Sequence, residues 1–242
     1  MKTLTSLCAI LFVVSLAYGQ TVVVGQQAID DSRYDGKEKN PYLFKEFAKA
    51  TATNSKKGET VEYLINYNGH TKEFEFIHKG VKSEMDARYY DVIEVNDYTP
   101  SDYYAAKYVT PTLKFVKGIN PKSPKTFGIV VYEDENLTLY KDFFAKISKK
   151  EFQDPARGVV TVETFMPNFN YFVKMGDGNK MVGFNKKKLL SALDHAKVES
   201  FVKKNKLKIK NETELVQVIQ HYSELTAAES STSGAIAKAG NK

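Results

Sequence analysis

The stretch VEYLINYNGHTKEFEFIH, residues 61–78, decides the fold of this chain. Residues 61–67 are rich in β-forming side chains and alternate in part between apolar and polar types. Asn68-Gly69 follows directly, and both residues tolerate the positive φ angles of a tight hairpin turn. Beyond it, Phe74 and Phe76 alternate with glutamates. The stretch therefore predicts two antiparallel strands paired across Asn68-Gly69.

Further strands are predicted along the chain that follows this hairpin. They cover residues 88–95, 113–116, 127–132, 137–147, 159–166, 170–175 and 181–184. Residues 60–184 are therefore predicted to form a β-rich domain of about eight to ten antiparallel strands, arranged as a curved sheet, a roll or an open barrel.

After Phe184 the apolar period changes from two residues to the 3.6 residues of a helix. Asn185 can cap a helix that begins at Lys186, and a second helix is expected at residues 196–204. Asn211-Glu212-Thr213-Glu214 resembles a capping box that starts a third. Residues 185–225 are therefore predicted to be a helical subdomain. Strands followed by helices indicate an α+β fold.

The two ends of the chain are predicted to lie outside this body. Lys2, the apolar run Leu7–Leu16 and Ala17-Tyr18-Gly19 together predict a signal peptide over residues 1–19. The run is shorter than the roughly 20 residues that span a bilayer, and no later stretch is apolar enough to be a transmembrane segment. The protein is therefore expected to be exported, to the periplasm, the outer surface or the medium. Residues 20–59 are expected to be an irregular lead-in, and residues 226–242, rich in Ala, Ser, Thr and Gly, a disordered tail.

The single cysteine, Cys8, lies inside the predicted signal peptide. The chain left after cleavage has no disulfide, thiolate metal ligand or cysteine nucleophile. A cysteine-free exported chain of this size favours a bacterial envelope or secreted protein.

No pattern in the chain predicts a catalytic, cofactor-binding or metal-binding residue. The four histidines lack metal-ligand spacing, and there is no Gly-x-Ser-x-Gly elbow or phosphate loop. The sequence therefore favours a non-enzymatic, exported binding or interaction protein that needs no cofactor. The alternative is a hydrolase that acts on cell-wall or host polysaccharide through a carboxylate pair, which the strand glutamates would have to bring together.

Lysines are concentrated in the predicted helices. Residues 186–210 hold nine lysines against Asp194 and Glu199, within a chain of net charge +6. A solvated helical surface is the favoured interpretation of this excess, and contact with an anionic envelope polymer is the alternative. The absence of arginine here argues against nucleic acid. Another envelope protein is the other possible partner. The candidate polyanion contacts are Lys186, Lys187, Lys188, Lys203, Lys204 and Lys206.

Four tyrosines gather in the proline-flanked segment 96–112. Flat rings stack on sugar faces, so Tyr98, Tyr103, Tyr104 and Tyr108 are candidate carbohydrate-stacking residues. The favoured interpretation is nevertheless that their rings fill the sheet, because tyrosine is also a good strand residue.

Several segments resemble a known group of proteins. They are residues 171–178 (YFVKMGDG), the lysine-rich helix 186–193, residues 201–212 (FVKKNKLKIKNE) and the final Tyr222-Ser223-Glu224-Leu225. Together they are similar to uncharacterised secreted proteins of Bacteroidota-type bacteria, over roughly residues 40–225. The resemblance implies a bacterial envelope setting. It implies no activity, because that family has none assigned.

Overall fold

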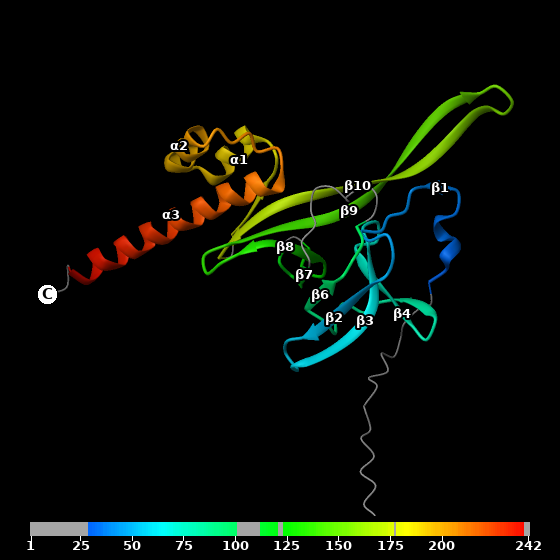
Figure 1. Ribbon diagram of the computed structural model, residues 1–242, viewed down its shortest axis with the longest axis horizontal. Coiled ribbons are helices and arrows are strands. Elements are labelled where there is room, and N and C mark those ends of the chain that lie inside the picture. Colours follow the sequence, from blue (N-terminus) through cyan, green and yellow to red (C-terminus); the bar gives the residue numbers. More distant parts are fainter. Residues whose placement is uncertain (1–28, 101–111, 121–122, 177, 240–242) are drawn as a thin grey trace, which may run out of the picture.

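The computed structural model describes residues 29–100, 112–120, 123–176 and 178–239, and in these ranges it has an α+β fold. Eleven strands form one open, mostly antiparallel sheet, followed by three helices (Figure 1). The predicted fold class is confirmed. The sheet is not closed into a barrel, because β5 and β1 stand at the two ends of the strand order and do not pair with each other.

The strand order is β1-β10-β9-β8-β7-β6-β2-β3-β4-β5, with β11 paired to β10. The strands are β1 (Lys37–Glu38), β2 (Ala48–Asn54), β3 (Glu59–Asn68), β4 (Glu73–His78), β5 (Val81–Glu84), β6 (Val92–Asn96), β7 (Thr112–Lys117), β8 (Phe127–Glu133), β9 (Thr138–Asp154), β10 (Gly158–Met175) and β11 (Gly178–Val182). The pair β1–β10 is parallel and the others are antiparallel.

The hairpin predicted at residues 61–78 exists, but its turn differs from the prediction. Asn68 is the last residue of β3 and pairs with Glu73, so the loop is residues 69–72 and its positive φ angle belongs to Lys72. Gly69 instead provides a close approach. Its carbonyl accepts a hydrogen bond from the Ala145 amide at 2.8 Å, which brings this turn against β9.

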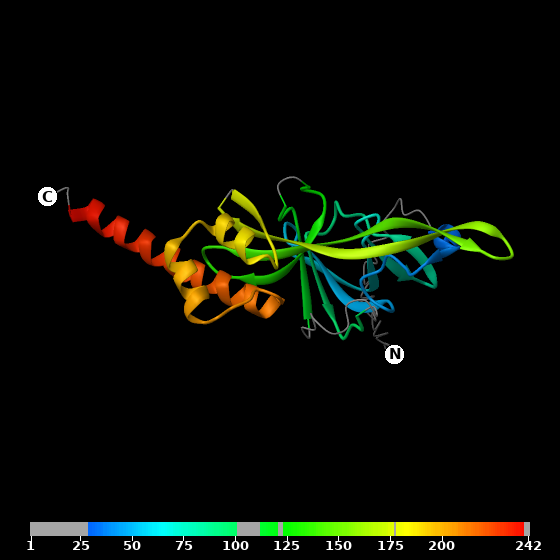
Figure 2. The same cartoon turned by 90° about the horizontal axis from the view of Figure 1, so that it is seen from above.

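Two long strands, β9 and β10, cross the molecule. Their outer part, residues 146–166, is a ribbon that projects from the body, two-stranded beyond its short pairing with β1 at residues 163 and 164, and is called the arm below (Figures 1 and 2). The sequence predicted two strands where β10 is one, with Pro167 inside it. Pro167 lies between the residues that pair with β1, which end at Thr164, and those that pair with β11, which begin at Tyr171. A proline is tolerated where a strand has a partner on one side only.

Two hydrophobic cores hold the fold together. The first lies within the curved sheet and includes Phe44, Tyr67, Phe74, Phe115 and Phe143. The second lies between the helices and the inner parts of β9–β11, and includes Leu139, Val173, Leu189, Val202 and Ile219.

The helices are α1 (Lys186–Leu193), α2 (Ala196–Lys204) and α3 (Glu212–Ala239). Asn185 caps α1 as predicted, accepting a hydrogen bond from the Lys188 amide. Asn211 likewise accepts one from the Glu214 amide at 2.9 Å at the start of α3. None of the helices in the described ranges is long and apolar enough to cross a membrane.

Two predicted boundaries are wrong. Residues 48–54, placed in the irregular lead-in 20–59, form the interior strand β2, which pairs with β3 and β6. Its small side chains (AKATATN) gave a weak apolar pattern although Ala48, Ala50 and Ala52 are buried. At the other end, the tail predicted to be disordered from residue 226 continues α3 to Ala239. Its alanines favour a helix even where little apolar surface can be buried. The predicted signal peptide lies outside the described residues.

Candidate binding pocket

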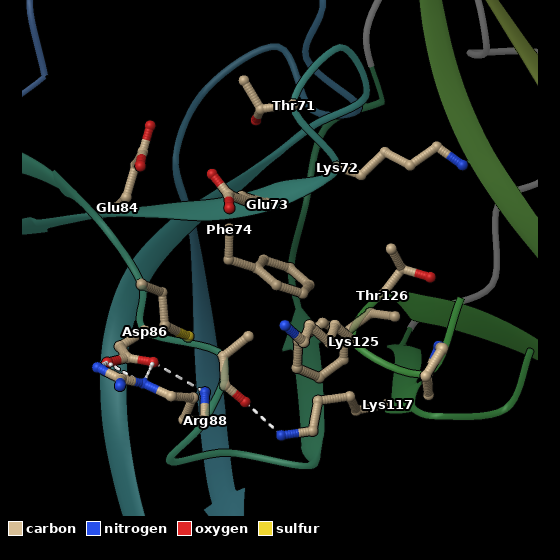
Figure 3. Close-up of a pocket in the computed structure, with 14 residues that line it drawn as sticks. Thr71, Lys72, Glu73, Phe74, Glu84, Asp86, Arg88, Lys117, Lys125 and Thr126 are labelled. Atoms are coloured by element: carbon tan, nitrogen blue, oxygen red, sulfur yellow. Dashed lines mark hydrogen bonds and ion pairs between the residues drawn. The ribbon is translucent and has the colours of Figure 1, made fainter. Parts of the chain in front are cut away.

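A pocket of about 540 Å³ lies beside the β3–β4 turn, in the size range of small-molecule sites (Figure 3). Three segments line it: residues 71–74 at the start of β4, residues 84–88 after β5, and the β7–β8 connection with Lys117 and residues 124–127. The first two segments are joined by the β4–β5 hairpin, whereas the third follows about thirty residues later in the chain. The curvature of the sheet brings them together.

The floor of the pocket is aromatic and rigid. Phe74 and Phe127 are buried, with ring centroids 5.1 Å apart in an edge-to-face arrangement, and Met85 is buried beside them. Phe74 also packs on Phe115 and Tyr67 of the first core. The floor is therefore preformed, because its residues are fixed by core packing.

Most charged groups around the pocket are already paired. Arg88 donates to both carboxylate oxygens of Asp86, with 2.6 Å between Nη2 and Oδ2. Lys117 donates to the carbonyl oxygen of Ala87. Lys72 points to Asp142 of β9, at 2.7 Å. Among the described residues, Lys125 has no hydrogen-bonded or ion-paired partner and is exposed. It is therefore the cation at the pocket that a ligand can neutralise.

Two of the three pocket carboxylates, those of Glu73 and Glu84, do not face the aromatic floor. Glu73 and Phe74 are adjacent in β4, so their side chains leave opposite faces of the sheet. Figure 3 shows the carboxyl groups of Glu73 and Glu84 directed away from the Phe74 ring, whereas Lys117 and Lys125 lie on the ring's side. The interior of the pocket thus combines apolar rings with positive charge.

The opposite face of β4 holds a buried polar cluster. Glu75 has an exposed fraction of 0% and its carboxylate receives hydrogen bonds from Tyr42 at 2.8 Å and Asn68 at 2.7 Å. Arg33 forms an ion pair with Glu75, and another with Glu84 at 3.3 Å. Burial, and then the charge of Glu75, raise the pKa of Tyr42. Because every charged group here has a partner, this cluster fixes the segment 31–44 to the sheet. It offers no unpaired charged group to a ligand.

Glu73 lies at the edge of this cluster. Its pKa is raised above the ordinary value by desolvation first, and then by the charge of Glu84 and a hydrogen bond with it. Two carboxyl groups that raise each other's cost of ionisation thus lie beside the pocket, and a carboxylate pair is what glycoside hydrolysis requires.

The predicted polyanion lysines lie on the helical subdomain, away from the pocket. Lys187, Lys188, Lys203, Lys204 and Lys206 are exposed. Lys186 donates to the carbonyl oxygen of Leu207 at 3.5 Å, which places the start of α1 beside the connector that carries Lys206. Lys203 pairs with Glu199 at 3.3 Å. The structure thus brings part of the set together.

Of the four predicted carbohydrate-stacking tyrosines, Tyr98 is described. It is partly buried, and its ring packs on Phe44 at 5.2 Å between centroids. This contact matches the favoured interpretation, in which the ring fills the core. Tyr103, Tyr104 and Tyr108 lie outside the described residues.

Sequence reasoning missed the pocket because its lining carries no motif. The residues come from a turn, a loop and a strand connection, and none of them stands out by spacing. In the described part of the chain, no group of three or more His, Cys, Asp or Glu side chains is placed to hold a metal ion. No protein-family model, curated protein or solved structure matches the chain.

Proposed function

We propose that this chain is an exported, non-enzymatic binding protein of a bacterial envelope, and that its pocket takes an anionic ligand with an apolar portion. The observation that carries the proposal is the composition of the pocket. Buried rings of Phe74 and Phe127 form its floor, Lys125 is uncommitted, and the carboxyl groups of Glu73 and Glu84 face away. An apolar floor with a few placed polar groups is the usual form of a small-molecule site.

A pair of fluorescent probes tests this assignment. Anilinonaphthalene sulfonate is anionic and aromatic, whereas N-phenylnaphthylamine has the same ring system without the charge. We expect Lys125→Glu to weaken binding of the sulfonate on the order of tenfold, corresponding to about 1.4 kcal/mol. Binding of the neutral probe should change little. Lys57→Glu, an equal charge change at the exposed β2–β3 turn, is the control. Equal losses in the two variants would show that net charge, and not the pocket, attracts the probe.

The hydrolase remains the alternative proposal, and the effect of Glu84 on the pKa of Glu73 is what favours it. Glu73 has the raised pKa of a proton donor. Against it, Glu84 is held by Arg33, and the carboxyl groups of Glu73 and Glu84 are directed away from the aromatic floor of the pocket. Release of reducing sugars from a cell-wall polysaccharide, abolished by Glu73→Gln, would favour the enzyme.

A further inference from the structure

One of the two faces of the arm carries a row of four apolar side chains. Cross-strand partners share a face, and the register pairs Phe152 with Val160 and Lys150 with Val162. Side chains alternate between the two faces along a strand, so Met166, four residues after Val162, lies on the same face. The exposed fractions are 48% for Phe152 and 47% for Met166. Phe152, Val160, Val162 and Met166 are called the apolar stripe below.

The stripe faces away from the body of the protein. Phe165, on the opposite face at the base of the arm, is fully buried and packs on Tyr34 and His70. Further out, that opposite face is polar except for Val159 near the tip. Glu163 forms ion pairs there with Lys149 at 2.6 Å and Lys37 at 3.6 Å. The arm is therefore an amphipathic ribbon, and the best-paired acid of its polar face is Glu163.

Cationic side chains lie beside the apolar stripe. Lys146 and Lys150 alternate with Phe152 along β9 and so share its face, and Arg157 is at the tip. The acidic residue nearest the tip, Asp154, uses its carboxylate to accept the amides of Ala156 and Arg157 at 2.8 and 2.9 Å. The other acids of the arm, Glu151 and Glu163, lie on the polar face. The outward face is thus both apolar and cationic.

Lysines on exposed strands also prevent edge-to-edge aggregation, which is their simplest role. That role explains charge on the arm but not the apolar residues beside it. A two-stranded ribbon is at best marginally stable in water, so an exposed apolar face on one is a cost that a binding partner removes.

We propose that the arm docks on an anionic lipid surface through the apolar stripe, with Lys146, Lys150 and Arg157 at the headgroups. Apolar side chains that enter the boundary between headgroups and acyl chains, flanked by cations, are the combination that binds such surfaces. A soluble polysaccharide would use the charges but gain nothing from the stripe. This site is separate from the pocket, and the proposal does not depend on the pocket's ligand.

The absence of tryptophan from the chain gives a clean experiment. Phe152→Trp places one reporter on the stripe, and Val159→Trp places one on the opposite face, where Val159 is 66% exposed. With vesicles of phosphatidylglycerol and phosphatidylcholine, we expect a blue shift of the emission of the first variant and no shift of the second. Vesicles of phosphatidylcholine alone should give a weaker response. Added salt should reduce the response to the anionic vesicles.

A second set of variants measures the contribution of the stripe itself. Phe152→Ser with Val162→Ser should lower vesicle binding at least tenfold in a flotation assay, whereas Val159→Ser should leave it unchanged. Thermal unfolding shows that each variant is folded. Equal shifts at positions 152 and 159, or no shift at either, would overturn the proposal. So would a shift at position 152 that appears without lipid as protein concentration rises, since that outcome assigns the stripe to contact between two copies of the chain.

Discussion

Lys141 of β9 donates to both carboxylate oxygens of Glu212 at the start of α3, at 3.1 and 2.8 Å. The lysine side chain is 4% exposed, and Tyr171 of β10 donates to the same carboxylate at 2.8 Å. This ion pair links the sheet to the helical subdomain. Burial lowers the pKa of Lys141 more than the nearby carboxylate raises it, so the lysine depends on Glu212 to stay charged.

Removing Glu212 should therefore destabilise the protein strongly. We expect Glu212→Ala to cost about 3–5 kcal/mol of unfolding free energy, because it leaves a buried charge uncompensated. Glu214→Ala, in the same first turn, removes an exposed contact to the Lys210 amide and should cost about 1 kcal/mol. Urea unfolding measures both. Restoration of most of the stability by Lys141→Met with Glu212→Leu would confirm that the unpaired charge causes the loss.

Glu75 should anchor the segment 31–44. Glu75→Ala removes the acceptor for Arg33, Tyr42 and Asn68 together, with an expected cost of about 3–5 kcal/mol. Hydrogen exchange should speed up first at the amides of residues 31–44. Glu84→Ala removes only a more exposed contact to Arg33 and should change exchange there far less. Uniform faster exchange over the whole sheet would contradict a local anchoring role.

Gly69 should not tolerate a side chain. A Cβ there would lie 2.4 Å from Cε1 of Phe143 and 2.9 Å from the Ala145 amide nitrogen. We expect Gly69→Ala to cost about 1–3 kcal/mol from overpacking. At Gly183, a Cβ meets nothing within 4 Å, so Gly183→Ala is the matched control and should be near neutral. Equal melting temperatures of the two variants would disprove the close packing of the turn on β9.

Glu73 gives a prediction about pH. Its pKa in the folded state is raised above the ordinary value, so the stability it contributes is present at low pH and is lost as the pH rises through the folded pKa. Glu73→Gln, which mimics the protonated group, should therefore be more stable than the wild type at pH 7, by less than about 1 kcal/mol because the site is exposed. The difference should vanish well below pH 4.5. Thermal unfolding across this range measures it. A variant less stable than the wild type at pH 7 would contradict the raised pKa.

The sequence predicted those elements whose signal is local. The alternating residues before Asn68 and the caps Asn185 and Asn211 identified β3, α1 and α3 because each depends on neighbours in the chain. Strand β2 was missed since its buried side chains are alanines, which carry little apolar contrast. Its place in the sheet depends on pairing with β6, about forty residues away in sequence.

The candidate site was beyond sequence reasoning for a related reason. The pocket forms where the β3–β4 turn, the residues after β5 and the β7–β8 connection meet, and the curvature of the sheet sets that meeting. Whether the ammonium group of Lys125 is ion-paired or free to bind a ligand depends on its distances to other charged groups. Such distances follow from the fold and not from spacing along the chain.

The continuity of β9 and β10 has a mechanical consequence. Both strands start at the tip, at Asp154 and Gly158. They run inward to Lys141 and Tyr171, the two residues that donate hydrogen bonds to Glu212. A pull on the tip draws both strands in the same direction, so it does not slide one along the other. The tension passes instead to the seams with β1, β8, β11 and α3, where the strands join the rest of the molecule. The ribbon therefore transmits a load at its tip to both hydrophobic cores.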